Sequence, residues 1–346
     1  MNTSVMNATI MNTTITNATD QNDTLDYNAS GYDEYAYIHF TVASVVALCL
    51  CVFGLVGNVI VFWYLCFKIQ RNKYTVYIIH LSTADAFFII FTGLLLMVYI
   101  NTFIGDVPDF KGKESLLLFI EIFYDTMQYA GMYILTTISM ERCISVLFPI
   151  WYQCNRPHNL SSIMCTAVWI LASAESLLEN LACTPQAFEA QTTECTAVEA
   201  ITFVLAIGIC LPLMVISSLT LLIKIQRTIR LHYPPKLYII IITAVLVFIL
   251  SVLPFNFLWF LMYFRLVSTD LQTVGLFFAT TYCTLLNSTI NPYIYFIVGK
   301  KWKQKSHNSI QEALQRAFRE GEEENDDSKS TKTNNTSSQS NLTVAI

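Results

Sequence analysis

The chain contains seven long apolar segments, each at least as long as the roughly 20 residues that an α-helix needs to cross a bilayer. With 54% hydrophobic and 13% charged residues, the chain is also more apolar than a soluble domain of 346 residues. We therefore predict an all-α integral membrane protein, with a seven-transmembrane helix bundle at residues 39–298. The segments lie near Phe40–Phe67, Thr75–Ile100, Ser115–Leu147, Leu160–Ala182, Ala197–Ile225, Leu237–Phe264 and Leu271–Val298.

Basic residues indicate which side of the membrane each loop faces. No lysine or arginine precedes Lys68, whereas basic residues fill the first and fifth loops and follow the last apolar segment. The positive-inside rule then predicts a multi-pass plasma-membrane protein with an extracellular N-terminus. The first apolar segment would act as its own insertion signal. The basic residues on the predicted cytoplasmic side are Lys68, Arg71, Lys73, Arg156, Lys224, Arg227, Arg230, Lys236, Lys300, Lys301, Lys303 and Lys305.

The N-terminal tail, residues 1–38, is polar, acidic and low in complexity, and we expect it to be disordered. It is crowded with Asn-x-Ser/Thr acceptors, which predict an extracellular, glycosylated tail. Its expected role is in expression and solubility rather than in ligand binding. The acceptors are Asn2, Asn7, Asn12, Asn17, Asn22 and Asn28.

The C-terminal part divides into two further regions. Residues 299–320 can form an amphipathic, basic juxtamembrane helix that binds membrane lipids at the anionic inner leaflet. Residues 321–346 form a Ser/Thr-rich tail behind an acidic run, and we expect disorder there. Phosphorylation would turn this tail into a polyanion that binds arrestin.

Polar residues inside the apolar segments are expensive, at about 2.5–3.5 kcal/mol for a charge at mid-membrane, so they should face the bundle interior. Asn58 lies in the first segment, Asp85 in the second, and Asn287 and Asn291 in the seventh. One interpretation is a hydrogen-bonded packing cluster that fixes the register of the helices. The other is a polar relay or cation site that rearranges between two states. The two interpretations are compatible.

The third segment ends in an adjacent acid and base, Glu141 and Arg142, before the pattern breaks at Pro149. Charged residues at a helix end often extend into the headgroups, and that explanation remains open. The other explanation is a functional membrane face, which the polar residues at matching depths in neighbouring segments favour.

Taken together, the motifs resemble those of the rhodopsin-like family of G-protein-coupled receptors. The resemblance covers roughly residues 40–318 and rests on Asn58, Leu81-Ser-Thr-Ala-Asp85, Glu141-Arg142-Cys143, Trp169, Pro212, Leu253-Pro254-Phe255, Asn291-Pro292 and Tyr295. Within that family, the Mas and Mas-related receptors are similar at Ser145-Val-Leu-Phe-Pro-Ile-Trp-Tyr152, Lys236-Leu-Tyr238 and Tyr295-Phe-Ile-Val-Gly299.

Some positions depart from the general family pattern. No cysteine lies between Cys66 and Cys143, so the usual disulfide from the third segment is missing. Of the 10 cysteines, Cys183 and Cys195 lie on the oxidising side, and we expect them to form a disulfide, which is similar to the Mas-related pattern. The sixth segment lacks the tryptophan that usually precedes the proline at Pro254. Its absence implies that the ligand binds close to the outer surface of the bundle. Gly131 stands where a serine usually helps to bind sodium.

The outward half of the chain is acidic, which attracts cations and repels anions. Glu179 and Glu199 lie one helical turn beyond Cys183 and Cys195, so a disulfide would bring both carboxylates toward one subpocket. The hypothesis is that they bind a basic group, with charge-assisted hydrogen bonds worth about 1.5–3 kcal/mol each. The alternative is that both are solvated residues at helix ends. Mas-related receptors that sense cationic peptides and amines are similar at these two positions.

Other side chains could contribute to the same pocket. Glu121 and Asp125, one turn apart on the third segment, form a second candidate acidic pair, with Tyr124 as the alternative inward-facing residue. Phe255 and Trp259 could line an apolar side, although aromatic residues in a membrane helix often serve packing or the interfacial belt.

At the inner face, the resemblance implies a switch. Arg142, held by Glu141 at rest, would meet a helix end of a heterotrimeric G protein, where partial negative charge favours a cation. Tyr295, with Asn291 and Pro292, would be its second element, moving inward as the sixth segment moves out.

Competing classes fit less well. A transporter would be expected to show internal repeats, and a retinal photoreceptor needs a lysine in the seventh segment. Spaced enzyme motifs are absent, and we expect no metal, no cofactor and no nucleic-acid partner. We predict a receptor that senses an extracellular cationic peptide or amine and activates a G protein. A neutral or lipid ligand is the alternative.

Overall fold

The computed structural model describes residues 26–104, 112–184, 190–229, 236–266, 272–300 and 310–318. Within these ranges, the side chains of residues 26–41, of Phe255 and Trp259 and of some further positions are not described. The predicted acceptors Asn2, Asn7, Asn12, Asn17 and Asn22 and the tail at residues 321–346 lie outside the described residues.

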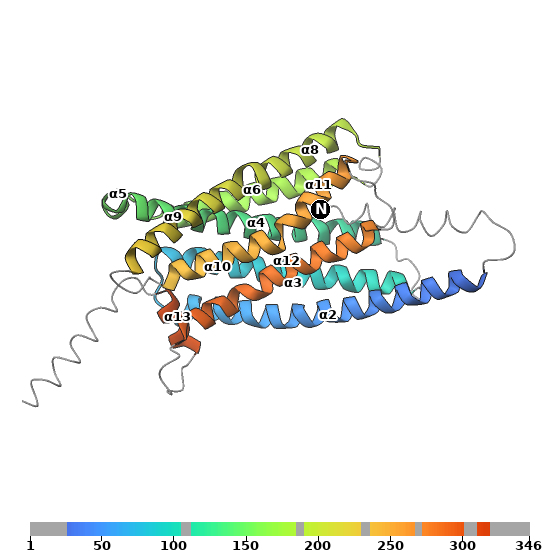
Figure 1. Ribbon diagram of the computed structural model, residues 1–346, viewed down its shortest axis with the longest axis horizontal. Helices are drawn as coiled ribbons and strands as arrows, with labels where there is room; N and C mark the ends of the chain where they lie inside the picture. The colour runs from blue at the N-terminus through green and yellow to red at the C-terminus, as the bar shows by residue number, and fades with distance from the viewer. Residues whose placement is uncertain are drawn as a thin grey trace, which may run out of the picture.

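The described residues form helices and no strands, and the long helices run side by side along the long axis of the molecule (Figure 1). Seven helical segments match the seven predicted apolar stretches. They are α2 (Asp26–Phe67), α3 (Lys73–Ile104), α4 (Lys113–Leu147), α6 (Leu160–Ala182), the fifth segment α8 (Thr193–Phe203), η1 (Val204–Cys210) and α9 (Leu211–Ile229), the sixth segment α10 (Lys236–Ser251) and α11 (Leu253–Tyr263), and α12 (Gln272–Gly299).

Four described stretches are long and apolar enough to cross a membrane by length and composition: Val42–Phe67, Lys73–Val98, Leu160–Ala182 and Thr193–Lys224. Polar and charged residues lower the hydropathy of α4, whose buried side chains include Glu121, Asp125, Glu141 and Arg142. A helix of this kind is stable in a bilayer when its polar face is turned toward its neighbours.

The first helix, α2, begins at Asp26, well before the expected end of the disordered tail at residue 38. Extending an existing helix adds one hydrogen bond for each residue that is fixed, whereas nucleating a new helix is costly. The membrane segment can therefore carry helix outward into a polar sequence that would not start a helix by itself. The acceptor Asn28 lies in this extension.

Two segments contain irregularities that the apolar pattern does not show. The fifth segment passes through a stretch of π-helix, Val204–Cys210, between α8 and α9. The sixth segment is interrupted at Val252, just before α11. Pro254 explains the interruption, because proline has no backbone N–H and restricts the residue before it.

Glycines allow α2 to approach α12 closely. A Cβ atom at Gly54 would lie 2.5 Å from Thr289 Oγ1, and one at Gly57 would lie 3.1 Å from Pro292 Cβ. Small residues at helix contacts are the usual device for close packing in membranes, where apolar lipid supplies no hydrophobic driving force. The approach lets the Asn58 amide donate to the Ser288 carbonyl at 3.0 Å.

A short helix, α13 (Ile310–Phe318), lies within the region predicted to form an amphipathic helix and packs on the end of the bundle (Figure 1). We expected its apolar face to lie on the lipid leaflet. Instead, Leu314 and Phe318 are buried, with the Phe318 ring 5.4 Å from the Tyr295 ring. The Asn72 amide donates to the Phe318 carbonyl at 2.9 Å. The apolar face of α13, which we expect from the sequence to contact lipid, therefore packs against the helix bundle.

Candidate functional site

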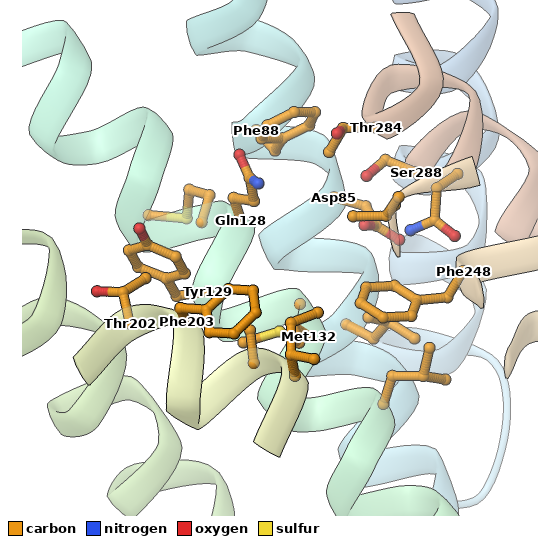
Figure 2. A pocket seen from close by; sticks show the side chains of 18 of the residues that line it. Asp85, Phe88, Gln128, Tyr129, Met132, Thr202, Phe203, Phe248, Thr284 and Ser288 are labelled. Atoms are coloured by element: carbon orange, nitrogen blue, oxygen red, sulfur yellow. The ribbon is translucent and has the colours of Figure 1, made fainter. Parts of the chain in front are cut away.

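A cavity of about 90 Å³ lies in the bundle, lined by residues of α3, α4, α6, α8, η1, α10, α11 and α12 (Figure 2). Its wall contains Glu179 and Glu199 from the acidic half of the chain, and Asp85, Asn287 and Asn291 from the expected polar relay. The cavity thus joins two groups of residues that the sequence analysis treated separately.

Carboxyl groups on α6 are bonded to tyrosines on α4. The Tyr129 hydroxyl donates to Glu179, and the Tyr133 hydroxyl donates to Glu175 one turn deeper. Both pairs have the four-residue spacing that places side chains on one face of a helix. The two faces therefore match turn for turn along the contact between α4 and α6.

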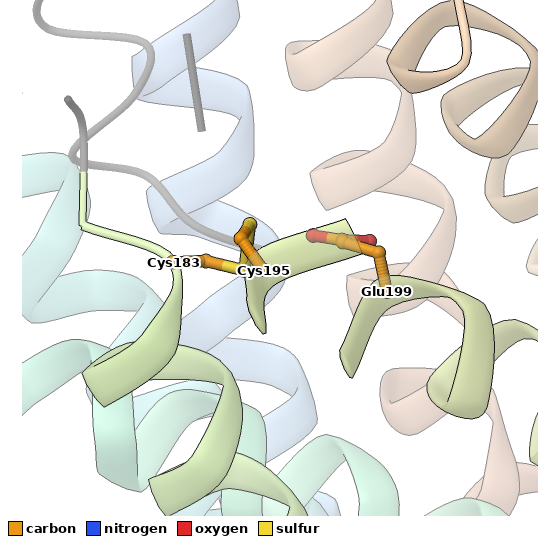
Figure 3. A group of neighbouring side chains, drawn as sticks. All are labelled: Cys183, Cys195 and Glu199. Atoms are coloured by element: carbon orange, nitrogen blue, oxygen red, sulfur yellow. A yellow bond between two sulfur atoms is a disulfide. The ribbon is translucent and has the colours of Figure 1, made fainter. Parts of the chain in front are cut away.

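The disulfide between Cys183 and Cys195 is present, as predicted, with Cα atoms 4.8 Å apart. It joins the end of α6 to the first turn of α8 (Figure 3). The two sulfur atoms and the Glu199 carboxylate lie within 4.8 Å of one another. Because the two sulfurs are bonded to each other, they offer no thiolate to a metal ion.

The carboxylates on the cavity wall are buried. Glu179 and Glu199 have exposed fractions of 2% and 8%, which does not fit the alternative of solvated residues at helix ends. Glu199 Oε1 has no hydrogen-bond partner among the described residues. Burial strengthens the field of such a carboxylate toward any cation that enters.

The second candidate pair is buried too, but away from the described lining of the cavity. Asp125 accepts a hydrogen bond of 2.9 Å from the Asn180 amide, and Glu121 has an exposed fraction of 1%. The alternative inward residue, Tyr124, is buried against Phe88, with ring centroids 4.9 Å apart. All three side chains therefore face the protein. The side chains of Phe255 and Trp259, predicted to line the pocket, lie outside the described residues.

The polar relay residues are brought together at the deep end of the cavity. Asp85 Oδ2 accepts a hydrogen bond of 2.8 Å from the Asn291 amide. Asn58 bonds the backbone of α2 and α12, and Asn287 lines the cavity. A Cβ atom at Gly131 would lie 3.9 Å from Asp85 Oδ1, so the glycine leaves space in front of this carboxylate.

At the opposite end of the bundle, Glu141 is bonded to Arg156 rather than to Arg142. Glu141 Oε1 accepts from Arg156 Nη2 at 2.6 Å and from the Tyr152 hydroxyl at 2.5 Å. The expected contact with Arg142 does not form because adjacent residues on a helix point in different directions. Tyr152 lies in the short helix α5 (Pro149–Cys154), where burial and the Glu141 hydrogen bond raise its pKa to about 12. The Tyr152 hydroxyl is the donor of this hydrogen bond, since a carboxylate oxygen can only accept.

Arg142 is buried, and its guanidinium carbon lies 2.7 Å from the centroid of the Tyr74 ring. A cation over an aromatic face is stabilised by the ring quadrupole. Tyr295, the expected second switch residue, has an exposed fraction of 1% beneath Phe318. Both residues are thus enclosed at the end of the bundle where α13 packs.

Residues 57–295 match the family model "7 transmembrane receptor (rhodopsin family)". The chain belongs to this family. Rat "Proto-oncogene Mas" is 33% identical over 288 residues, which cover 82% of this chain and 84% of that protein. Mouse "Mas-related G-protein coupled receptor member D" is 34% identical over 314 residues, covering 87% and 93%. Rat "Mas-related G-protein coupled receptor member F" is 31% identical over 291 residues, covering 84% and 82%.

The comparisons identify a multi-pass plasma-membrane receptor rather than an enzyme, similar to Mas and the Mas-related receptors. Sequence reasoning about this receptor missed Tyr129, Tyr133 and Glu175 as partners across α4 and α6. A signal was available, because the four-residue spacing of the two tyrosines matches that of Glu175 and Glu179. The pairing of Arg156 with Glu141 could not be predicted from spacing, since it depends on how the chain turns through α5.

Proposed function

We propose that the receptor senses an extracellular cationic ligand, a basic peptide or an amine, through Glu179 and Glu199, and activates a heterotrimeric G protein. The observation that carries the proposal is that both buried carboxylates line one cavity and that Glu199 Oε1 lacks a hydrogen-bond partner among the described residues. A buried acceptor of this kind favours a ligand that supplies a positively charged donor.

The disulfide supports the same proposal because it ties α6 to α8 close to both acids. Cys183 and Cys195 hold the two helix ends in one arrangement before the ligand arrives. Pre-organisation of this kind lowers the entropy lost on binding. A ligand with one cationic group could then bind both carboxylates.

The proposed direction of sensing follows from the basic loops and the crowded glycosylation acceptors, both of which favour an extracellular N-terminus. On the other side, Arg142 is the proposed contact for the G protein, and several relatives are named as G-protein coupled receptors. Phosphorylation of the Ser/Thr-rich tail would recruit arrestin.

The test is G-protein activation in cells that are given a panel of basic peptides and amines. The native receptor is compared with Glu179→Gln/Glu199→Gln at matched surface expression. Losing two charge-assisted hydrogen bonds at about 1.5–3 kcal/mol each should lower potency by roughly 10²- to 10⁴-fold. Glu194→Gln is the matched control, because Glu194 lies beside Cys195 in the same helix but is exposed.

The outcomes separate the alternatives. Equal activation of the native and doubly substituted receptors would show that the acids are bystanders and that the ligand binds elsewhere. If no basic compound activates either form, the cationic proposal fails and a neutral or lipid ligand becomes the next candidate.

A further inference from the structure

Arg142 is not positioned by Glu141, the residue expected from the sequence to hold it, because Glu141 is bonded to Arg156. The fifth and sixth segments supply no carboxylate for it, since residues 200–269 contain no aspartate or glutamate. Arg142 has an exposed fraction of 4%, so in this arrangement it does not reach a cytoplasmic partner. A buried cation is costly unless a neighbouring group compensates it, and α3 supplies such a group.

The compensating group is the ring of Tyr74, in the first turn of α3. The guanidinium carbon of Arg142 lies 2.7 Å from the centroid of this ring, and Tyr74 has an exposed fraction of 4%. A cation over an aromatic face is attracted by the ring quadrupole, and the attraction is stronger where water is excluded. The ring therefore favours the inward orientation of the guanidinium over an orientation toward the cytoplasm.

Hydrogen bonds fix Tyr74 at its backbone and at its hydroxyl. The Tyr74 N–H donates to Asn72 Oδ1 at 3.0 Å, as expected for a cap at the start of a helix. The Tyr74 and Tyr152 hydroxyls lie 3.0 Å apart, and Tyr152 donates to Glu141. Because a hydroxyl has a single proton to donate, Tyr74 is the donor between the two tyrosines. Glu141 thus acts on Arg142 indirectly, by orienting the ring that contacts it.

We propose that Tyr74 is the positioning residue that holds Arg142 in the inward arrangement, and that the guanidinium leaves the Tyr74 ring before it meets a G protein. This inference rests on the proposed role of Arg142 as the G-protein contact. It does not depend on which ligand binds in the cavity. The activity of the receptor without ligand is then set by how strongly the ring retains the guanidinium.

The test is ligand-free G-protein activation by the full-length receptor in cells, compared at matched surface expression and measured for each Gα class in turn. Tyr74→Leu removes the ring and should raise this basal activation roughly tenfold, because a desolvated cation–π contact is lost. Tyr74→Phe keeps the ring and should raise it much less. Tyr152→Phe is the control, because it removes a hydroxyl from the same network and leaves the Tyr74 ring in place.

A second measurement detects the contact in the native receptor, without relying on a variant that folds poorly. The ring current of an aromatic face shifts the resonances of a guanidinium above it upfield. One arginine signal of isotope-labelled receptor in nanodiscs should be shifted in this way, and Arg142→Ala assigns it. The signal should move downfield when a nucleotide-free G protein is added, because the guanidinium then leaves the Tyr74 ring.

Native basal activation in Tyr74→Leu would overturn the inference, as would a native Arg142 signal without the upfield shift. An equal rise in Tyr74→Phe and Tyr74→Leu would also overturn it, because the hydroxyl bond rather than the ring would then hold the closed arrangement. If Arg142→Ala retains G-protein activation, the proposed role of Arg142 in coupling fails, and this inference fails with it.

Discussion

At the scale of single residues, a buried charge is satisfied by the partner that its side chain can reach, not by the nearest one in sequence. Glu141 and Arg142 are adjacent, yet Glu141 bonds Arg156 and Arg142 lies over Tyr74. Successive helical side chains diverge, so an adjacent acid and base serve two different neighbours. The short helix α5 returns the chain so that Arg156 meets α4.

Replacing Arg156 by leucine should destabilise the receptor by about 3–5 kcal/mol, because the Glu141 carboxylate would stay buried without its cation. The measurement is the thermal unfolding midpoint of purified receptor. Arg316→Leu is the control, since Arg316 is partly exposed, its partner Glu312 is exposed, and i,i+4 pairs of this kind contribute about 0.3–0.5 kcal/mol. If both variants lost similar stability, burial would not determine how much the Glu141–Arg156 pair contributes to the free energy of unfolding.

Replacing Arg142 by alanine should abolish agonist-induced G-protein activation while surface expression is retained. The guanidinium is the group proposed to meet the G protein, and it forms no part of the Glu141 pair in this structure. Surface labelling and nucleotide exchange in the same cells provide the two measurements. Retained signalling would remove Arg142 from the switch.

At the scale of elements, the contact between α2 and α12 depends on the missing side chain at Gly54. Gly54→Ala should push the two helices apart, because its Cβ would lie 2.5 Å from Thr289 Oγ1 and 2.7 Å from Ile89 Cδ1. Overpacking of this kind typically costs about 1–3 kcal/mol. Gly93→Ala is the control, because a Cβ there meets nothing within 4 Å. The measurement is the thermal unfolding midpoint of each variant. Equal midpoints for Gly54→Ala and Gly93→Ala would contradict the close contact between α2 and α12.

The docking of α13 makes a second prediction for an element. Phe318→Ala should release α13, since truncating a buried phenylalanine costs about 3–5 kcal/mol, more than a nine-residue helix can recover by itself. Hydrogen exchange of the α13 amides should accelerate strongly. Ile310→Ala, at the exposed start of the same helix, should leave exchange nearly unchanged. Unaltered exchange in Phe318→Ala would show that other contacts hold α13.

The elements that the sequence predicted well are those set by apolar length. The fourth apolar stretch agrees with α6 at both ends, because hydropathy changes sharply there. The π-helical stretch at Val204–Cys210 and the extension of α2 to Asp26 were not predictable in this way. Both features depend on how a helix continues from the adjoining helical residues. The amino-acid composition of the stretch itself therefore does not reveal them.

At the scale of the whole molecule, the sequence predicted that Glu179 and Glu199 lie near each other, because the disulfide between Cys183 and Cys195 constrains the two helix ends. The expected bond between Cys183 and Cys195 places Glu179 and Glu199 in one region from their spacing alone. The continuity between this region and Asp85 could not be derived, because it depends on the space that Gly131 and the lining side chains leave between helices. Helix faces can be read from spacing, whereas empty volume requires packing in three dimensions.

On the proposed orientation and with the proposed cationic ligand, the negative charge of the outer face should also raise the rate at which the ligand associates. The screening length falls from about 30 Å at 0.01 M salt to about 10 Å at 0.1 M, so attraction at a distance weakens over this range. Contacts with the buried Glu179 and Glu199 are much less screened. Higher salt should therefore slow association of a basic ligand several-fold while its dissociation rate changes little.

Stopped-flow binding to receptor in nanodiscs at the two salt concentrations measures both rates. Glu114→Gln/Glu194→Gln, which neutralises two acids of the described outer face that lie outside the cavity wall, should flatten the dependence of the association rate on salt. The dissociation rate of this variant should match that of the native receptor, because its buried contacts are intact. Should salt act mainly on dissociation, the ligand would be held by exposed charges, and the buried acids would not be its binding site.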